Sequence, residues 1–214
     1  MTTYEKALLL AKAFDSKNPN LFRLIGKNVN KSVFQILDDG RDSGWVLLIG
    51  SEKTIREEIE NLESIAKYGI KIPELGRKEM ISVEYKSTVQ FAFLEEYIDG
   101  FISKNTEIST DINIFCSKLY TELVNESSKE KFPYPLTKVK YTKALDSVTI
   151  LYSIFEKYPE FDIDDLQLFY QRTTGLILVT DPGTKGTSYM RDKHIEWLKA
   201  IIKELENVKR KCKF

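Results

Sequence analysis

The sequence has very few of the residues that form metal sites and nucleophilic triads. It contains one histidine, His194, and two cysteines, Cys116 and Cys212, which are too far apart to form a spaced ligand set. A zinc site and a histidine-based catalytic triad are therefore not expected. No apolar run approaches the length of a membrane-spanning helix, and the first residues lack a charged-then-apolar signal pattern. We therefore expect a cytoplasmic protein without a membrane partner.

The chain also lacks net charge. Its 32 Lys and Arg residues balance 32 Asp and Glu residues over 214 positions. This balance argues against a broad surface for nucleic acid or for an anionic membrane, so another protein is the expected partner. With 42% hydrophobic and 12% aromatic residues, the chain can bury the core of one large domain or of two small lobes.

The most informative stretch is an acidic segment with the pattern of a β-hairpin. Two apolar runs, Leu166–Tyr170 and Leu176–Val179, flank a polar turn that contains glycine. Asp162 precedes the first run, and Asp181 follows the second, where a Pro-Gly pair ends the strand. Both carboxylates should lie at the same end of the hairpin. Anchored carboxylates suit Mg²⁺, especially when phosphates complete its coordination shell.

This acidic hairpin resembles the catalytic and metal-binding segments of protein kinases. In that family a catalytic Asp is followed five residues later by an Asn, then by a hairpin and an Asp-Phe-Gly turn. The resemblance assigns Asp162 to catalysis, and Gln167 and Asp181 to the metal. A second register assigns Asp165 and Tyr170 in place of Asp162 and Gln167. We favour the first register, because the Asn position directly precedes the first strand of the hairpin.

The first part of the chain resembles the glycine-rich loop of the same family. Two β-like runs within Leu21–Leu37 flank a loop that is similar to the kinase pattern G-x-G-x-x-G-x-V. Gly26 and Val33 match this pattern. Asn28 and Lys31 replace the second and third glycines. The resemblance makes Gly26 and Asn28 candidate contacts to a nucleotide.

The next segments resemble a kinase strand and helix, with one important departure. The apolar strand Trp45–Ile49 has no lysine near Leu48, where kinases place the lysine that holds the α- and β-phosphates. Lys53–Lys67 has apolar residues at helical spacing, with Thr54 as its expected cap. This helix resembles the one whose glutamate pairs with the kinase lysine. Glu58 is the matching glutamate, and the sequence leaves it without its usual partner.

The middle of the chain resembles the hinge between kinase lobes. Two expected strands, Met80–Tyr85 and Thr88–Tyr97, form a hairpin that ends in a hinge-like segment. Backbone groups of such hinges bind the adenine edge, so the resemblance makes Glu95 and Tyr97 candidate nucleotide contacts. Apolar residues at helical spacing predict three later helices: Asp111–Asn125, Val139–Tyr158 and Arg191–Val208.

Together these matches predict an α+β protein with a bilobal kinase-like fold. Residues 1–98 would form a small antiparallel-sheet N-lobe with an N-terminal helix, and residues 99–214 a truncated helical C-lobe. The resemblance implies a degenerate, pseudokinase-like domain, because the strand lysine, two loop glycines and the Asn are absent. Such a domain would bind another protein as a regulator, an inhibitor or an immunity-type protein, with little or no phosphoryl transfer and no cofactor. Candidate anchors for that partner are Phe101, Tyr134, Tyr189 and Arg191.

The alternative is an atypical small kinase. It would use ATP and Mg²⁺ to transfer phosphate to a hydroxyl group of a protein or small molecule, with Asp162 orienting the acceptor. The two hypotheses differ in whether the acidic residues or the exposed anchors are sensitive to substitution.

Overall fold

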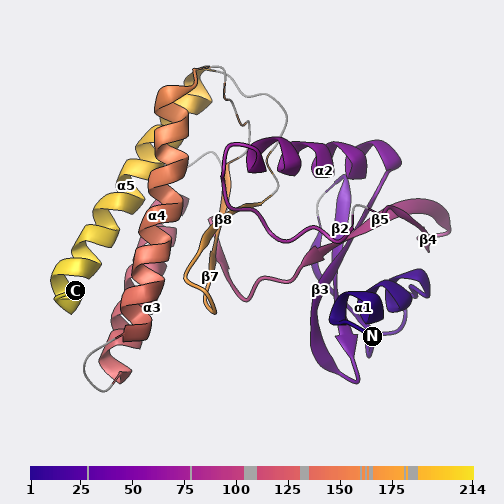
Figure 1. Ribbon diagram of the computed structural model, residues 1–214. Helices are drawn as coiled ribbons and strands as arrows, with labels where there is room; N and C mark the ends of the chain where they lie inside the picture. The colour runs from indigo at the N-terminus through magenta and orange to yellow at the C-terminus, as the bar shows by residue number, and fades with distance from the viewer. Residues whose placement is uncertain are drawn as a thin grey trace. The chain divides into compact units, whose positions relative to one another are not determined.

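The computed structural model describes residues 1–27, 29–77, 79–103, 110–130, 135–159, 161, 163, 166–180, 182 and 188–214. Within these residues the protein is α+β, as expected, and it divides into two compact units (Figure 1). Unit 1 comprises Met1–Glu60 and Pro73–Ile98, and unit 2 comprises Asn61–Ile72 and Asp99–Phe214.

Unit 1 is built on a five-stranded antiparallel sheet of order β1-β2-β3-β5-β4. Its strands are β1 (Phe22–Lys27), β2 (Lys31–Asp38), β3 (Arg41–Gly50), β4 (Ile81–Tyr85) and β5 (Thr88–Glu96). Two-residue turns, Asp39-Gly40 and Lys86-Ser87, connect β2 to β3 and β4 to β5. All four turn residues have positive φ, as the type I′ turns of tight hairpins require. The antiparallel sheet expected within residues 1–98 is confirmed, and in it Trp45–Ile49 lies beside the β1–β2 hairpin.

Helices cover both faces of this sheet, and side chains of β3 are therefore buried on both sides. The helices are α1 (Thr3–Lys12) and α2 (Glu52–Ala66). Trp45, Leu47 and Ile49 lie in the apolar cluster that includes α1. Val46 and Leu48 lie in the cluster that includes the first half of α2. Because successive strand residues point to opposite faces, a strand that is covered on both faces has a continuous apolar sequence.

The helix α2 has the expected apolar stripe but a different cap. Ser51 Oγ accepts the N–H of Thr54 at 3.1 Å and lies 2.8 Å from the hydroxyl of Thr54. Ser51 therefore caps the helix, and the prediction of Thr54 as the cap was wrong. The stripe is buried along its length: Ile55, Ile59, Leu62 and Ile65.

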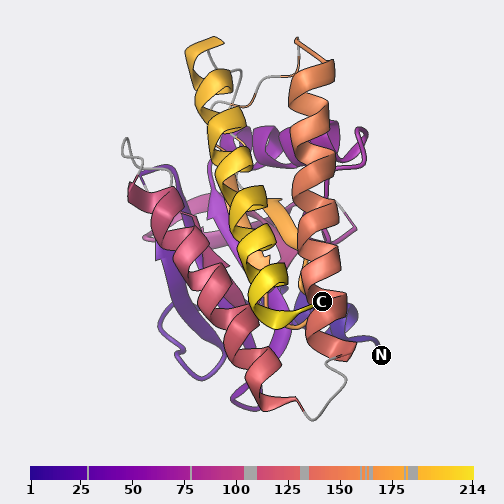
Figure 2. The same ribbon diagram turned by 90° about the vertical axis from the view of Figure 1, so that its left-hand side faces the viewer.

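Unit 2 combines a small antiparallel sheet with three long helices (Figure 2). The sheet has the order β6-β7-β8. The elements are β6 (Gly100–Ile102), α3 (Thr110–Lys129), α4 (Pro135–Lys157), β7 (Gln167–Gln171), β8 (Ile177–Thr180) and α5 (Ser188–Cys212). The hairpin predicted for the acidic segment is confirmed as β7–β8, and α5 packs against both α3 and α4. Among the residues that the structure describes, no helix is long and apolar enough to cross a membrane.

The turn between β7 and β8 lies directly against α4. Gly175 has a φ of +80°, a conformation that favours glycine. A Cβ atom at this position would also collide with the backbone of Lys140 in α4. Glycine is thus required here both for the turn and for the close approach of the hairpin to the helix.

The short strand β6 buries Phe101, which we expected to be an exposed anchor in a loop. Phe101 is only 8% exposed. Its ring centroid lies 5.4 Å from that of Phe115 and 5.2 Å from that of Tyr170. Phe101 lies in a strand paired with β7, so the prediction of Phe101 as an exposed anchor was wrong.

Candidate functional site

A buried ion pair in unit 1 is the strongest candidate site. Lys31 Nζ lies 2.9 Å from Glu58 Oε2, and the two side chains are 9% and 8% exposed. A hydrogen bond between two charged groups is stronger than a neutral one, and its burial shields it from solvent. The sequence leaves Glu58 without the strand lysine that the resemblance implies, and the structure supplies a different partner, Lys31 of β2.

The alternation of side chains in β2 explains why Lys31 reaches α2. Phe34 and Ile36 belong to the cluster that includes α1. Val33 instead packs against the cluster that includes α2. Lys31 precedes Val33 by two residues and so projects from the same face of the strand. This parity places the lysine under the helix that carries Glu58.

Lys31 and Leu48 lie on neighbouring strands of the sheet. Leu48, to which the kinase resemblance assigned the lysine position, is buried among apolar residues of α2. It pairs with Val33 of β2, two residues from Lys31. A lysine–glutamate pair is thus present, although the lysine comes from the neighbouring strand. In the sequence pattern Lys31 stands only as a replacement for a loop glycine. The signal for its position on the strand is that it lies in phase with Val33.

The rest of the glycine-rich-like loop is described only in part. Gly26 lies in β1 opposite Val33, after an irregularity in the pairing between Leu24 and Gly26. A Cβ atom at Gly26 would lie 3.6 Å from Val33 Cβ, which is an ordinary contact. The atoms around Gly26 therefore leave room for a Cβ atom at this position. Asn28 lies outside the described residues, and Val29 beside it is fully exposed.

The backbone donors of the hinge-like segment are already used within unit 1. The N–H of Tyr97 donates to the carbonyl of Gly44 at 2.9 Å. The N–H of Glu96 donates to the carbonyl of Glu74 at 2.8 Å. Glu95, the other residue assigned to the hinge, is 9% exposed. An adenine edge would have to replace these backbone hydrogen bonds or use other groups.

Two residues assigned to the acidic hairpin lie within the described structure, Gln167 of the first register and Tyr170 of the second, and Tyr170 is fully buried. Gln167 begins β7, is partly buried and pairs with Thr180, the last residue of β8. Asp162, its alternative Asp165, and Asp181 lie outside the described residues. Across the described residues, no group of three His, Cys, Asp or Glu side chains could hold a metal ion. The carbonyl oxygen of Gln167 is an acceptable but uncharged Mg²⁺ ligand.

Pro182, the residue after Asp181, contacts α2. The side-chain amide of Asn61 donates to the carbonyl of Pro182 at 3.2 Å. Both residues belong to unit 2. This contact fixes the turn residue after β8 to a helix that lies more than a hundred residues earlier in the sequence.

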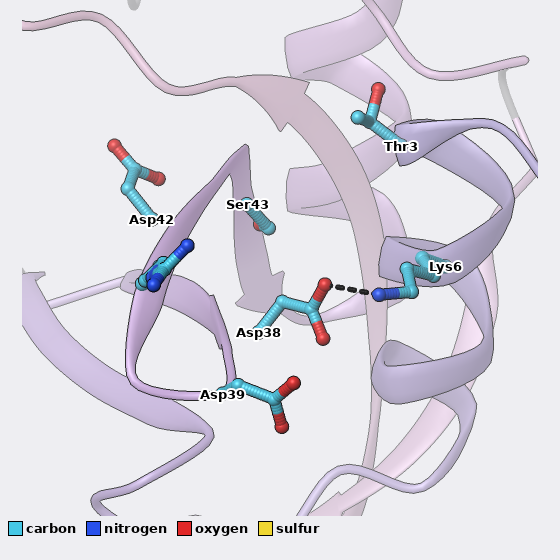
Figure 3. Close-up of a pocket in the computed structure, with 7 residues that line it drawn as sticks. Thr3, Lys6, Asp38, Asp39, Asp42 and Ser43 are labelled. Atoms are coloured by element: carbon cyan, nitrogen blue, oxygen red, sulfur yellow. Dashed lines mark hydrogen bonds and ion pairs between the residues drawn. The ribbon is translucent and has the colours of Figure 1, made fainter.

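A polar cavity in unit 1 lies at the β2–β3 turn (Figure 3). It has a volume of about 390 Å³, and its lining includes Asp38, Asp39 and Asp42. Lys6 binds Asp38, and this hydrogen bond raises the pKa of Lys6. Lys31 and Asp38 are the two ends of β2, so about 23 Å of strand separates them. This cavity therefore does not extend the Lys31–Glu58 site.

A smaller cavity in unit 2, of about 270 Å³, contains Arg172 at its edge. The guanidinium group of Arg172 lies 3.3 Å from a carboxylate oxygen of Asp99 and 3.2 Å from one of Glu122. Its charge is neutralised by these two partners, so it is poorly suited to bind an anion.

No protein-family model matches the chain, and its sequence has no significant match among curated proteins.

Proposed function

We propose that the chain is an atypical kinase-like phosphotransferase in which Lys31 takes the role of the missing strand lysine. The observation that carries this proposal is the buried Lys31–Glu58 ion pair. Phosphoryl transfer depends mainly on positioning the phosphates and neutralising their charge, and a lysine held by a glutamate supplies both. The missing lysine was the main argument for a degenerate domain, so this pair favours the enzyme hypothesis.

The arrangement of unit 1 adds support. A hairpin, a strand, a helix and a second hairpin follow one another and share one sheet and its covering helix. The kinase resemblance implies this sequence of elements for an N-lobe. The proposal therefore includes a bilobal kinase-like fold, with lobes over residues 1–98 and 99–214.

The kinase resemblance gives each assigned residue a role in this proposal. Lys31, positioned by Glu58, would contact the α- and β-phosphates of ATP. Asp181 and Gln167 would hold Mg²⁺, which neutralises phosphate charge when bound. Asp162 would accept the proton of the acceptor hydroxyl as that oxygen takes the γ-phosphoryl group and ADP leaves. The acceptor belongs to a protein or a small molecule.

Thermal unfolding with and without ATP and Mg²⁺ tests this proposal. A ligand at about a hundred times its Kd stabilises a protein by about 2.7 kcal/mol, which raises the midpoint by roughly 5–10 °C for a chain of this size. We expect this rise with ATP and Mg²⁺ together, and a smaller rise with ATP alone. Asp181→Asn should abolish the difference between the two conditions and leave the unliganded midpoint nearly unchanged. A midpoint that does not respond to saturating ATP and Mg²⁺ would count against the enzyme hypothesis.

One observation favours the second candidate function, a degenerate kinase-like domain that binds another protein as a regulator, an inhibitor or an immunity-type partner. The backbone N–H groups of Glu96 and Tyr97 donate to carbonyls within unit 1. These two N–H groups are therefore not available to an adenine edge unless the hinge-like segment changes its backbone hydrogen bonds.

Paired substitutions distinguish the two functions in a pull-down and a phosphoryl-transfer assay. Tyr134 and the side chain of Tyr189 lie outside the described residues, whereas Arg191 is partly buried and donates to the carbonyl of Phe155. Tyr189 is therefore the preferred anchor to test. For a binding protein, Tyr189→Ala should weaken partner capture at least tenfold, and Asp181→Ala should leave it intact. Loss of capture with Asp181→Ala but not with Tyr189→Ala would refute the assignment of the anchor.

A further inference from the structure

Basic side chains of unit 2 gather at one end of its three helices, although the whole chain has no net charge. At this end α3 and α5 finish and α4 begins (Figure 2). We call this surface the basic end. It consists of exposed residues from all three helices and the residue after α5: Lys129, Lys138, Lys209, Arg210, Lys211 and Lys213.

Two contacts hold these helix ends together. Ser127 Oγ of α3 lies 3.2 Å from Cys212 Sγ of α5. The ring of Tyr141 in α4 packs against that of Phe214, with centroids 5.3 Å apart. The cations that flank these contacts therefore belong to one continuous surface of unit 2.

The cations of the basic end have no described acidic partner, although Arg210 donates a hydrogen bond to the side-chain oxygen of Asn207. None of its six cations forms an ion pair with a described residue. Lys140 of α4 offers a contrast, because it is buried and lies 2.6 Å from Glu126. The helix dipole favours cations in the last turn of α5, but it does not favour Lys138 at the start of α4.

Exposed apolar side chains accompany these cations. Leu136 is 60% exposed and Val139 is 48% exposed, and both flank Lys138 in the first turns of α4. Lysines beside exposed aliphatic residues are typical of surfaces that lie in the interface of a membrane. A lysine is a compact point charge without the fixed fork of arginine. It therefore suits a diffuse layer of anionic headgroups better than a directional contact.

We propose that the basic end docks on an anionic lipid bilayer. Its lysines contact the headgroups, while Leu136 and Val139 enter the interface. No membrane partner was expected from the zero net charge, because a sum over the whole chain does not show a local cluster of cations. The inference is independent of the proposed phosphotransferase activity, since it uses none of the residues of that site.

Sedimentation of the full chain with vesicles tests the proposal. Vesicles of phosphatidylcholine should bind little protein, and vesicles in which about one lipid in three is phosphatidylserine should bind it in a salt-sensitive manner. Each cation near such a surface changes affinity about fivefold, so Lys211→Gln with Lys213→Gln should weaken binding about 25-fold. The matched control, Lys17→Gln with Lys53→Gln, removes two exposed lysines of unit 1 and should have little effect. Leu136→Ser should weaken the binding that remains at high salt.

Three results would overturn the proposal. An equal loss of binding in the control pair would show a general charge effect. Equal binding to vesicles with and without phosphatidylserine would exclude headgroup recognition. Binding to polyglutamate without binding to phosphatidylserine vesicles would assign the basic end to an acidic protein instead. Because every substituted residue is exposed, unchanged circular dichroism and thermal midpoints will show that the variants remain folded.

Discussion

Replacing Lys31 with methionine should both destabilise the protein and abolish nucleotide binding. Glu58, which is 7% exposed, would become a buried carboxylate without its lysine. Loss of one partner from a buried ion pair costs about 3–5 kcal/mol. Urea unfolding should report this loss as a lower midpoint with an unchanged slope. The matched control is Lys53→Met, because Lys53 has a side chain that is 84% exposed and should change the free energy of unfolding very little.

A second substitution separates the stabilising role of Lys31 from its functional role. Replacement of a buried ion pair by apolar residues of similar volume is often neutral or stabilising. Lys31→Met with Glu58→Leu should therefore recover most of the lost free energy of unfolding. It should still show no thermal shift with ATP and Mg²⁺, since the phosphate contact is absent. A stable double variant that keeps wild-type ATP affinity would remove Lys31 from the proposed site.

Most of the elements of unit 1 could be predicted because their sequence patterns are local. The apolar run of β3 indicates a strand that is covered on both faces, and the stripe of α2 indicates an amphipathic helix. The turn between β4 and β5 was also placed correctly. The cap of α2 was misplaced by three residues, since Ser51 and Thr54 can both accept a backbone N–H and the pattern does not distinguish them.

The Lys31–Glu58 pair could not be predicted, because it depends on register as well as on sequence pattern. The two residues are 27 positions apart, and their contact requires β2 to present Lys31 to the face covered by α2. The β2–β3 pairing also contains an irregularity between Gln35 and Leu37. Such a bulge changes which side chains share a face, so the residues of β2 beyond it do not indicate the face on which Lys31 lies.

The strand β6 was missed for a related reason. It has only three residues, which is too short for a periodic signal. It exists through pairing with β7, and the N–H of Ser103 extends this contact to the carbonyl of Leu168, 65 positions away. The burial of Phe101 follows from that distant partner, and no local pattern contains it.

Acidification should destabilise unit 2 through His194, the one histidine of the chain. This side chain is fully buried, with its ring centroid 5.8 Å from that of Phe155 and 5.3 Å from that of Trp197. Neither ring nitrogen has a hydrogen-bond partner in the described part of the chain. Burial, with a smaller effect from the charge of Lys193, lowers the pKa of His194 to about 4. The folded protein therefore holds this imidazole in its neutral form.

The sign of the pH dependence follows from the lowered pKa. Above the ordinary value of 6.5, both the folded and the unfolded chain carry a neutral imidazole, and His194 adds no pH dependence. As the pH falls from 6.5 towards 4, the unfolded chain binds a proton that the folded chain excludes. The free energy of unfolding should therefore decrease, by about 3 kcal/mol near the lower end of this range.

Comparison with His194→Leu isolates this effect. The variant keeps an apolar side chain in an apolar site and cannot titrate at this position. Both proteins share the same carboxylates, so the pH dependence due to carboxylates cancels when their free energies of unfolding are subtracted. Urea unfolding of both proteins over this pH range should show that the free energy of unfolding of the wild-type protein falls relative to that of the variant as the pH decreases. Because the chain has a single imidazole, its NMR resonances report the pKa directly. An imidazole that titrates near 6.5 in the folded protein, or a stability difference that does not change with pH, would show that burial does not hold His194 neutral.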